Sequence, residues 1–92
     1  MRIADRIRDK LTAALAPERI EIVDESHRHA GHAGAREGGE SHFRVEIVSA
    51  AFEGMPRVDR QRRVYALLAG EFADGVHALS LATKTPAEAS RG

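Results

Sequence analysis

Hydrophobic residues near the N-terminus recur every four positions. Charged and small residues separate these positions, which are Ile3, Ile7, Leu11 and Leu15. This spacing brings the apolar side chains onto one helical face, so it predicts an amphipathic helix over residues 2–15. Pro17 is expected to end the helix, because proline disfavours helical backbone at the residue before it.

Three further segments have the pattern of β-strands, namely residues 19–26, 42–49 and 76–83. In the second of them, Arg44 and Glu46 alternate with apolar neighbours. A period of two predicts strands with one buried face. In the third segment, His77 shares a face with Leu79 and Leu81.

Two helices complete the predicted order of elements. Val64, Leu68 and Phe72 are four residues apart and predict a core-facing helix over residues 58–73, after a turn at residues 52–56. Thr85 and Glu88 have the spacing of a capping box and predict a short C-terminal helix. The four aromatic residues are expected in the core; they are Phe43, Phe52, Tyr65 and Phe72.

The order helix, strand, strand, helix, strand, short helix predicts an α+β fold with a three-stranded mixed sheet. The first two strands are consecutive and should be antiparallel. A helix joins the second strand to the third, which should therefore run parallel to it. The third strand must then begin at the sheet edge where the first two strands are connected. His77 is expected at this edge.

The connection between the first two strands holds most of the histidines. His27, His29, His32 and His42 lie within residues 24–42, among four of the eight glycines. A loop this long is usually functional or disordered, and residues 27–40 are predicted to be flexible. Imidazoles suit zinc, copper, nickel and iron, so the loop and His77 form a candidate metal site. Solvated loop histidines are the alternative, and His42, which faces away from Phe43, is predicted to be structural.

Composition narrows the classes of function. The 92 residues carry a net charge of +0 and have no cysteine. A single domain over residues 1–92 with a tail at 90–92 is expected. The absence of cysteine excludes disulfides, thiolate catalysis and self-contained iron–sulfur sites. Charges interrupt the N-terminal apolar positions and no apolar run could span a bilayer, so a cytoplasmic protein without membrane contact is expected.

Several motifs together resemble the BolA family. In order, they are DES-x-x-HA, ESHF-x-V-x-I-V-S, F-x-G, R-x-R-x-V-Y, VHALSL and T-x-T-P-x-E, spread between Ile20 and Glu88. The resemblance implies a fold similar to class II KH domains. It also implies a monothiol glutaredoxin as partner, with a 2Fe-2S cluster bridged between the two proteins. The isolated chain would hold no cluster and would be a monomer, forming a heterodimer with its partner.

The resemblance also implies the ligands of that cluster. The glutaredoxin cysteine and glutathione would supply sulfur. The BolA-like chain would supply the histidine at the head of the third strand, here His77, and one from the loop. His29 is the preferred loop ligand. The loop is longer here than in the simpler family pattern and carries His32, which is the alternative ligand.

Three other classes of function are alternatives to cluster ligation. A DNA-binding transcriptional regulator of stress response and cell shape would use a basic stretch, made up of Arg57, Arg60, Arg62 and Arg63. KH domains clamp nucleic acid with a GxxG loop between two helices, and the turn at residues 54–57 has only the first of these glycines. The alternative interpretation of the basic stretch is a solvated helix face. A plain zinc or nickel carrier would use the loop histidines. No nucleophile elbow, P-loop or dinucleotide motif occurs, so an enzyme is not expected.

Overall fold

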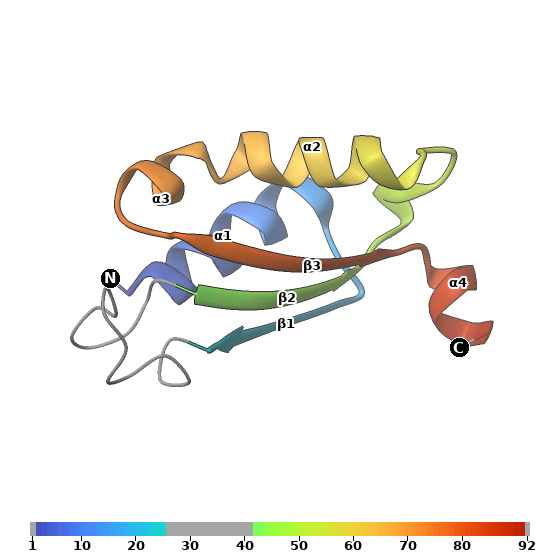
Figure 1. The fold of residues 1–92 in the computed structure, drawn as a ribbon. Helices are drawn as coiled ribbons and strands as arrows, with labels where there is room; N and C mark the ends of the chain where they lie inside the picture. The colour runs from blue at the N-terminus through green and yellow to red at the C-terminus, as the bar shows by residue number, and fades with distance from the viewer. Residues whose placement is uncertain (1, 26–41, 92) are drawn as a thin grey trace.

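The computed structural model describes residues 2–25 and 42–91. The elements follow the predicted order (Figure 1). They are α1 (Ile3–Leu15), β1 (Arg19–Asp24), β2 (His42–Val48), a short 3-10 helix (Ala50–Phe52), α2 (Arg57–Leu67), α3 (Ala69–Ala73), β3 (Ala78–Lys84) and α4 (Pro86–Arg91). No helix within these two ranges is both long and apolar enough to cross a membrane.

The sheet has the predicted topology. Its strand order is β1-β2-β3, with β1 antiparallel and β3 parallel to β2. In the parallel pair, His42 lies opposite Ala78, and Val48 lies opposite Lys84. As a result β1 ends at the edge where β2 and β3 begin, on the left in Figure 1. The mixed α+β sheet expected from the order of elements is confirmed.

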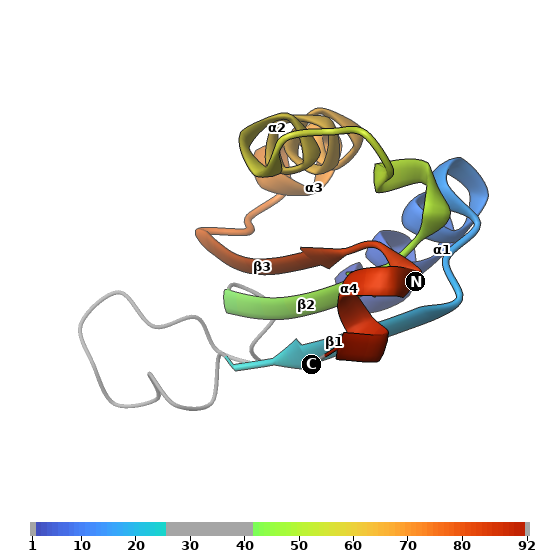
Figure 2. The ribbon, with the colours of Figure 1, turned by 90° about the vertical axis from the view of Figure 1, so that its right-hand side faces the viewer.

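The hydrophobic core lies between this sheet and the helices. In α1 the four predicted apolar positions are all buried, and the helix packs against β1, while α2 packs against β3. Figure 2 shows both long helices on one side of the sheet and α4 at the end where β3 finishes. The inward strand residues alternate, as the period of two requires; they include Phe43, Val45 and Ile47. Within the described parts of the chain, the opposite face of the sheet is exposed to solvent at Glu21, Arg44 and Ser80.

The helix predicted over residues 58–73 is broken at Leu68. The backbone there leaves helical geometry, with φ −101° and ψ 15°. The Leu68 N–H is shared between the carbonyl oxygens of Val64 and Tyr65, at 3.0 and 3.2 Å. This local tightening rotates the following turn, so Glu71 rather than Phe72 takes the fully buried position.

The break also changes the expected set of core aromatics. Phe43 and Phe52 are buried as predicted. Phe72 is only partly buried against the core, and Tyr65 is 40% exposed. Tyr65 follows Val64, which takes the inward direction on α2, so the phenol is directed outward along the helix surface.

The C-terminal helix begins with the predicted capping box. The Thr85 N–H donates to Glu88 Oε1 at 2.9 Å, and the Glu88 N–H donates to Thr85 Oγ1 at 3.2 Å. These two bonds satisfy backbone donors that a helix start otherwise leaves unpaired. The helix runs to Arg91, so residues 90 and 91, expected to belong to a tail, are helical.

The Glu88 carboxylate should make the stability of the protein sensitive to acid. A hydrogen bond from Arg60, followed by one from the Thr85 N–H, lowers the pKa of Glu88 from 4.5 to about 2. A carboxyl group whose pKa is lower in the folded state stabilises that state above its unfolded pKa and loses this contribution as pH falls. We therefore expect wild-type stability to decrease more steeply between about pH 5 and pH 2 than that of Glu88→Gln. Urea unfolding of both proteins across this range tests the prediction, and parallel pH profiles would contradict it.

Candidate functional site

His77 lies on a sharply defined turn at the start of β3. Gly75 has φ 127°, which glycine adopts without strain, and the Gly75 N–H donates to the Phe72 carbonyl at 3.3 Å. The next residue, Val76, is buried in the core, and its N–H donates to the Glu71 carbonyl at 3.1 Å. With Val76 anchored in this way, the exposed His77 is held at the edge of the sheet.

An electrostatic network fastens this turn to α1. Arg6 Nη2 donates to Asp74 Oδ2 at 2.6 Å and lies 2.9 Å from Glu71 Oε2. Lys10 Nζ donates to Glu71 Oε1 at 2.7 Å. The hydrogen bond with Asp74 raises the pKa of the Arg6 guanidinium. The buried Glu71 is therefore paired with two cations, and α1 contributes to holding the turn before His77.

A second histidine lies beside His77. The rings of His42 and His77 are stacked, with their centroids 6.3 Å apart and an interplanar angle of 26°. His42 begins β2 and faces away from the buried Phe43, as predicted, but the sequence had suggested only a structural role for it. We call these two residues the histidine pair. The parallel register explains why the two histidines are close, because it aligns His42 with Ala78, one residue after His77.

The predicted loop ligands His29 and His32 lie outside the described residues. The residues that flank the segment 26–41 do lie at the histidine pair. The Glu25 N–H donates to the His42 carbonyl at 2.8 Å, which continues the ladder between the first two strands. The connection between β1 and β2 therefore leaves and re-enters the sheet at the edge where His77 lies, as the topology predicted.

An aromatic side chain on α2 is bonded to the start of β3. The Tyr65 hydroxyl donates to the Leu79 carbonyl at 3.2 Å, and the Tyr65 ring lies 5.4 Å from that of Phe72. Leu79 is only two residues after His77. The half-exposed phenol is thus bonded to the strand that His77 precedes, and tyrosine is a frequent anchor in protein interfaces.

Three of the four arginines in the basic stretch are exposed, and the fourth is buried. Arg57, Arg62 and Arg63 are exposed on α2. Arg60, in contrast, is 5% exposed, and its guanidinium donates to the Met55 and Thr83 carbonyls and to Glu88. All of its nitrogens are directed into the protein, so the prediction that Arg60 belongs to a phosphate-binding surface is wrong. The other three arginines remain candidates for that surface.

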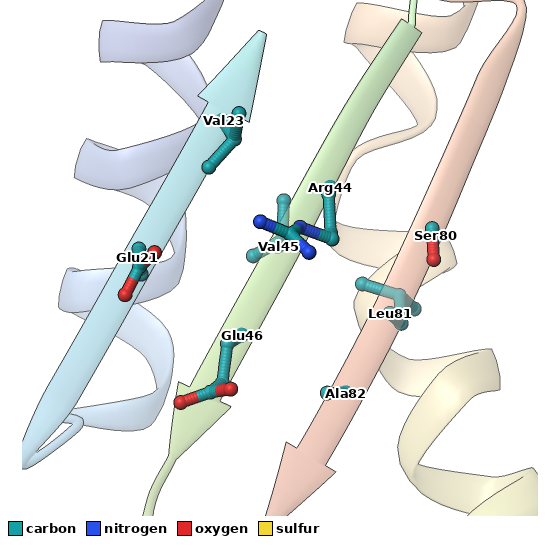
Figure 3. Close-up of a pocket in the computed structure, with 8 residues that line it drawn as sticks. All are labelled: Glu21, Val23, Arg44, Val45, Glu46, Ser80, Leu81 and Ala82. Atoms are coloured by element: carbon teal, nitrogen blue, oxygen red, sulfur yellow. The ribbon is translucent and has the colours of Figure 1, made fainter. Parts of the chain in front are cut away.

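The open face of the sheet carries a separate shallow pocket. Figure 3 shows it crossing all three strands, with Glu21, Arg44, Glu46 and Ser80 among its lining residues. Its charges are mixed, and neither member of the histidine pair lines it. It does not belong to the candidate site.

The histidine pair can contribute ligands but does not complete a metal site. Among residues 2–25 and 42–91, no group of three or more histidine or acidic side chains is arranged to hold a metal ion. Two imidazoles leave at least two positions of a four-coordinate ion or cluster iron to other groups. The residues present thus suit a site whose remaining ligands come from another molecule or from water.

Comparison with known proteins agrees with this fold. The BolA-like protein family matches residues 11–88. The chain is 47% identical over 85 residues to the DNA-binding transcriptional regulator BolA of Escherichia coli K12, covering 92% of this chain and 77% of that protein. It is also 47% identical over 92 residues to a Sinorhizobium protein named for its position in the cobS 5′ region, covering 99% of each.

Longer relatives and solved structures extend the match. The chain spans 54% of chloroplastic BOLA1 and 24% of SufE-like protein 1, both from Arabidopsis thaliana, at 52% and 49% identity. The solved structure of Arabidopsis BolA1 superposes with a TM-score of 0.84 at 45% identity, covering 96% of both chains. A match over most of the sequence, supported by the same fold, shows that this chain belongs to the BolA-like protein family.

Proposed function

We propose that this protein binds a monothiol glutaredoxin and supplies histidine ligands to a 2Fe-2S cluster bridging the two proteins. Its role would be iron–sulfur cluster trafficking or regulation linked to iron and redox state. His77 is the proposed ligand from the sheet. His29 is the proposed loop ligand, with His32 as the alternative.

The observation that supports this proposal most is the position of His77. Its imidazole is exposed at the edge where the residues flanking segment 26–41 leave the sheet. A ligand shared with a second protein must be reachable from outside and must lie near its co-ligand. The exposed Tyr65, whose hydroxyl donates to the carbonyl of Leu79 on the same strand, offers contact area for a partner.

The donor set fits a shared cluster. Iron–sulfur clusters are normally held by cysteine thiolates, and this chain has none. The sulfur ligands would therefore come from the glutaredoxin cysteine and glutathione. Histidine in place of cysteine on one iron raises the reduction potential of a cluster, as in Rieske centres. Co-ligation by this chain should then change both the spectrum and the potential of a cluster that the glutaredoxin already carries.

Mixing with a cluster-loaded monothiol glutaredoxin tests the proposal. We expect the visible circular dichroism spectrum to change, and the change to saturate near one equivalent of this protein per cluster. Iron and sulfide analysis of the purified complex should give two of each per heterodimer. A spectrum that stays unchanged at excess protein would contradict the proposal. His29→Ala and His32→Ala, compared in the same titration, identify the loop ligand.

DNA binding is the second candidate function. It is favoured by the name of the Escherichia coli relative and by the exposure of Arg57, Arg62 and Arg63 on one helix. Binding through these arginines should weaken steeply as salt rises, because phosphate contacts release counterions. A mobility-shift assay at moderate salt tests it with the double variant Arg62→Ala/Arg63→Ala. Equal retention of the variant and the wild type would show that Arg62 and Arg63 do not contact the DNA.

A further inference from the structure

We propose that the shallow pocket on the open face of the sheet binds small zwitterions of the size of a dipeptide. Arg44 holds the carboxylate of such a ligand, and Glu46, with Glu21 opposite it, holds the ammonium group. The pocket lies on the face of the sheet that α1 and α2 leave uncovered. The site is independent of the proposed function, because it uses no histidine and needs no glutaredoxin.

Two carboxylates lie directly opposite each other in this pocket. The antiparallel register pairs Glu21 of β1 with Glu46 of β2, and like charges at opposed positions of two strands destabilise a sheet. Arg19 is the ion-pair partner of both. Its Nη2 lies 3.2 Å from Glu21 Oε2, and its Nε lies 3.8 Å from Glu46 Oε1. Two negative charges therefore share one cation, and the ammonium group of a ligand relieves the excess.

A guanidinium supplies the opposite charge at the other end of the pocket. Arg44 lies two residues before Glu46 on β2, and its side chain is 56% exposed. Its ion pair with Glu25 spans 3.9 Å, which is too long for a hydrogen bond. The guanidinium donors thus remain available for a planar carboxylate, which arginine binds through two parallel hydrogen bonds. The hydroxyl of Ser80, opposite Arg44 on β3, lines the same end.

The spacing of these charges sets the length of the ligand. Two residues of a strand advance the chain by about 6.6 Å, and an extended dipeptide spans at most about 7 Å. The pocket has a volume of about 240 Å³, below the roughly 300–1,000 Å³ of sites for drug-sized ligands. Figure 3 shows why there is room, since β3 carries only the short side chains of Ser80 and Ala82 beside Arg44 and Glu46.

A nuclear magnetic resonance titration of the isotope-labelled wild type with L-alanyl-L-alanine at low salt tests the proposal. We expect saturable shifts of the amide signals of residues 44–46 and 80–82, with weak, millimolar binding, because exposed ion pairs contribute little. The same dipeptide with an acetylated N-terminus and an amidated C-terminus has no charges and should bind about tenfold more weakly. L-Alanine, whose two charges are too close together to reach both ends, should bind as weakly as the blocked dipeptide.

Four variants assign the charges. Arg44→Gln and Glu46→Gln should each weaken binding of L-alanyl-L-alanine by up to about fivefold. Arg63→Gln and Glu53→Gln make the same changes of charge at exposed positions outside the pocket and should bind as wild type.

Shifts that do not saturate, or equal binding of the free and blocked dipeptides, would overturn the proposal. Wild-type affinity in both Arg44→Gln and Glu46→Gln would overturn it as well. The comparison of the three ligands uses only wild-type protein, so it remains decisive even if a variant does not fold.

Discussion

Arg60→Ala is expected to lower the free energy of unfolding by about 2–4 kcal/mol. The Arg60 Nε donates to the Met55 carbonyl at 2.8 Å, and Nη1 donates to the Thr83 carbonyl at 3.1 Å. Both Nη atoms reach the Glu88 carboxylate, at 2.7 and 3.2 Å. The guanidinium carbon also lies 5.8 Å from the centre of the Phe52 ring. Truncation removes all of these contacts together and leaves partly buried acceptors without their donor.

Urea unfolding of Arg60→Ala measures this loss, and Arg63→Ala is the matched control. Arg63 lies on the same helix but is exposed, so its truncation should change stability by less than about 0.5 kcal/mol. Arg60→Lys should recover only part of the loss, because an ammonium cannot form the two-pronged contact with a carboxylate. Equal effects of Arg60→Ala and Arg63→Ala would show that the buried contacts contribute little.

The burial of Arg60 could not be predicted from the sequence. Four arginines within seven residues indicate a basic surface when only neighbours along the chain are considered. Two of the partners of Arg60, Thr83 and Glu88, lie 23 and 28 residues away. Their distance from Arg60 depends on how β3 and α4 pack against α2, which no local pattern contains. The break at Leu68 is of the same kind, since an uninterrupted four-residue spacing predicts one straight helix.

The strands and their directions could be predicted because they depend on local alternation and on chain connection. A helix between two neighbouring strands makes them parallel, and this places His77 at the edge where β1 and β2 are connected. The position of His42 near His77 could also be predicted from the direction of the strands. If β2 and β3 begin together, the first residue of β2 must lie near the residues that open β3. This prediction requires the register between β2 and β3. The alternation of apolar and polar residues does not fix that register, because a shift of two residues keeps the same side chains on the same face.

Replacing His77 by alanine should abolish co-ligation of a glutaredoxin-bound cluster. Under the proposed function, His77 is the one ligand that comes from the rigid sheet, and no other described histidine occupies its turn. We expect the change in visible circular dichroism on mixing to disappear. The fold should persist, because His77 is exposed and the neighbouring Val76 keeps its place in the core. A shift in the thermal midpoint of only a few degrees would establish that the loss concerns the ligand and not stability.

Two further variants serve as controls in this experiment: His77→Cys should restore a ligand, and His27→Ala should have no effect. A cysteine at position 77 still offers iron a ligand, so co-ligation should return with a different spectrum and a lower reduction potential than with histidine. His27→Ala removes an imidazole that the proposal leaves unused and should behave as wild type. If His77→Ala retained the full spectral change, the cluster could not depend on His77 for a ligand.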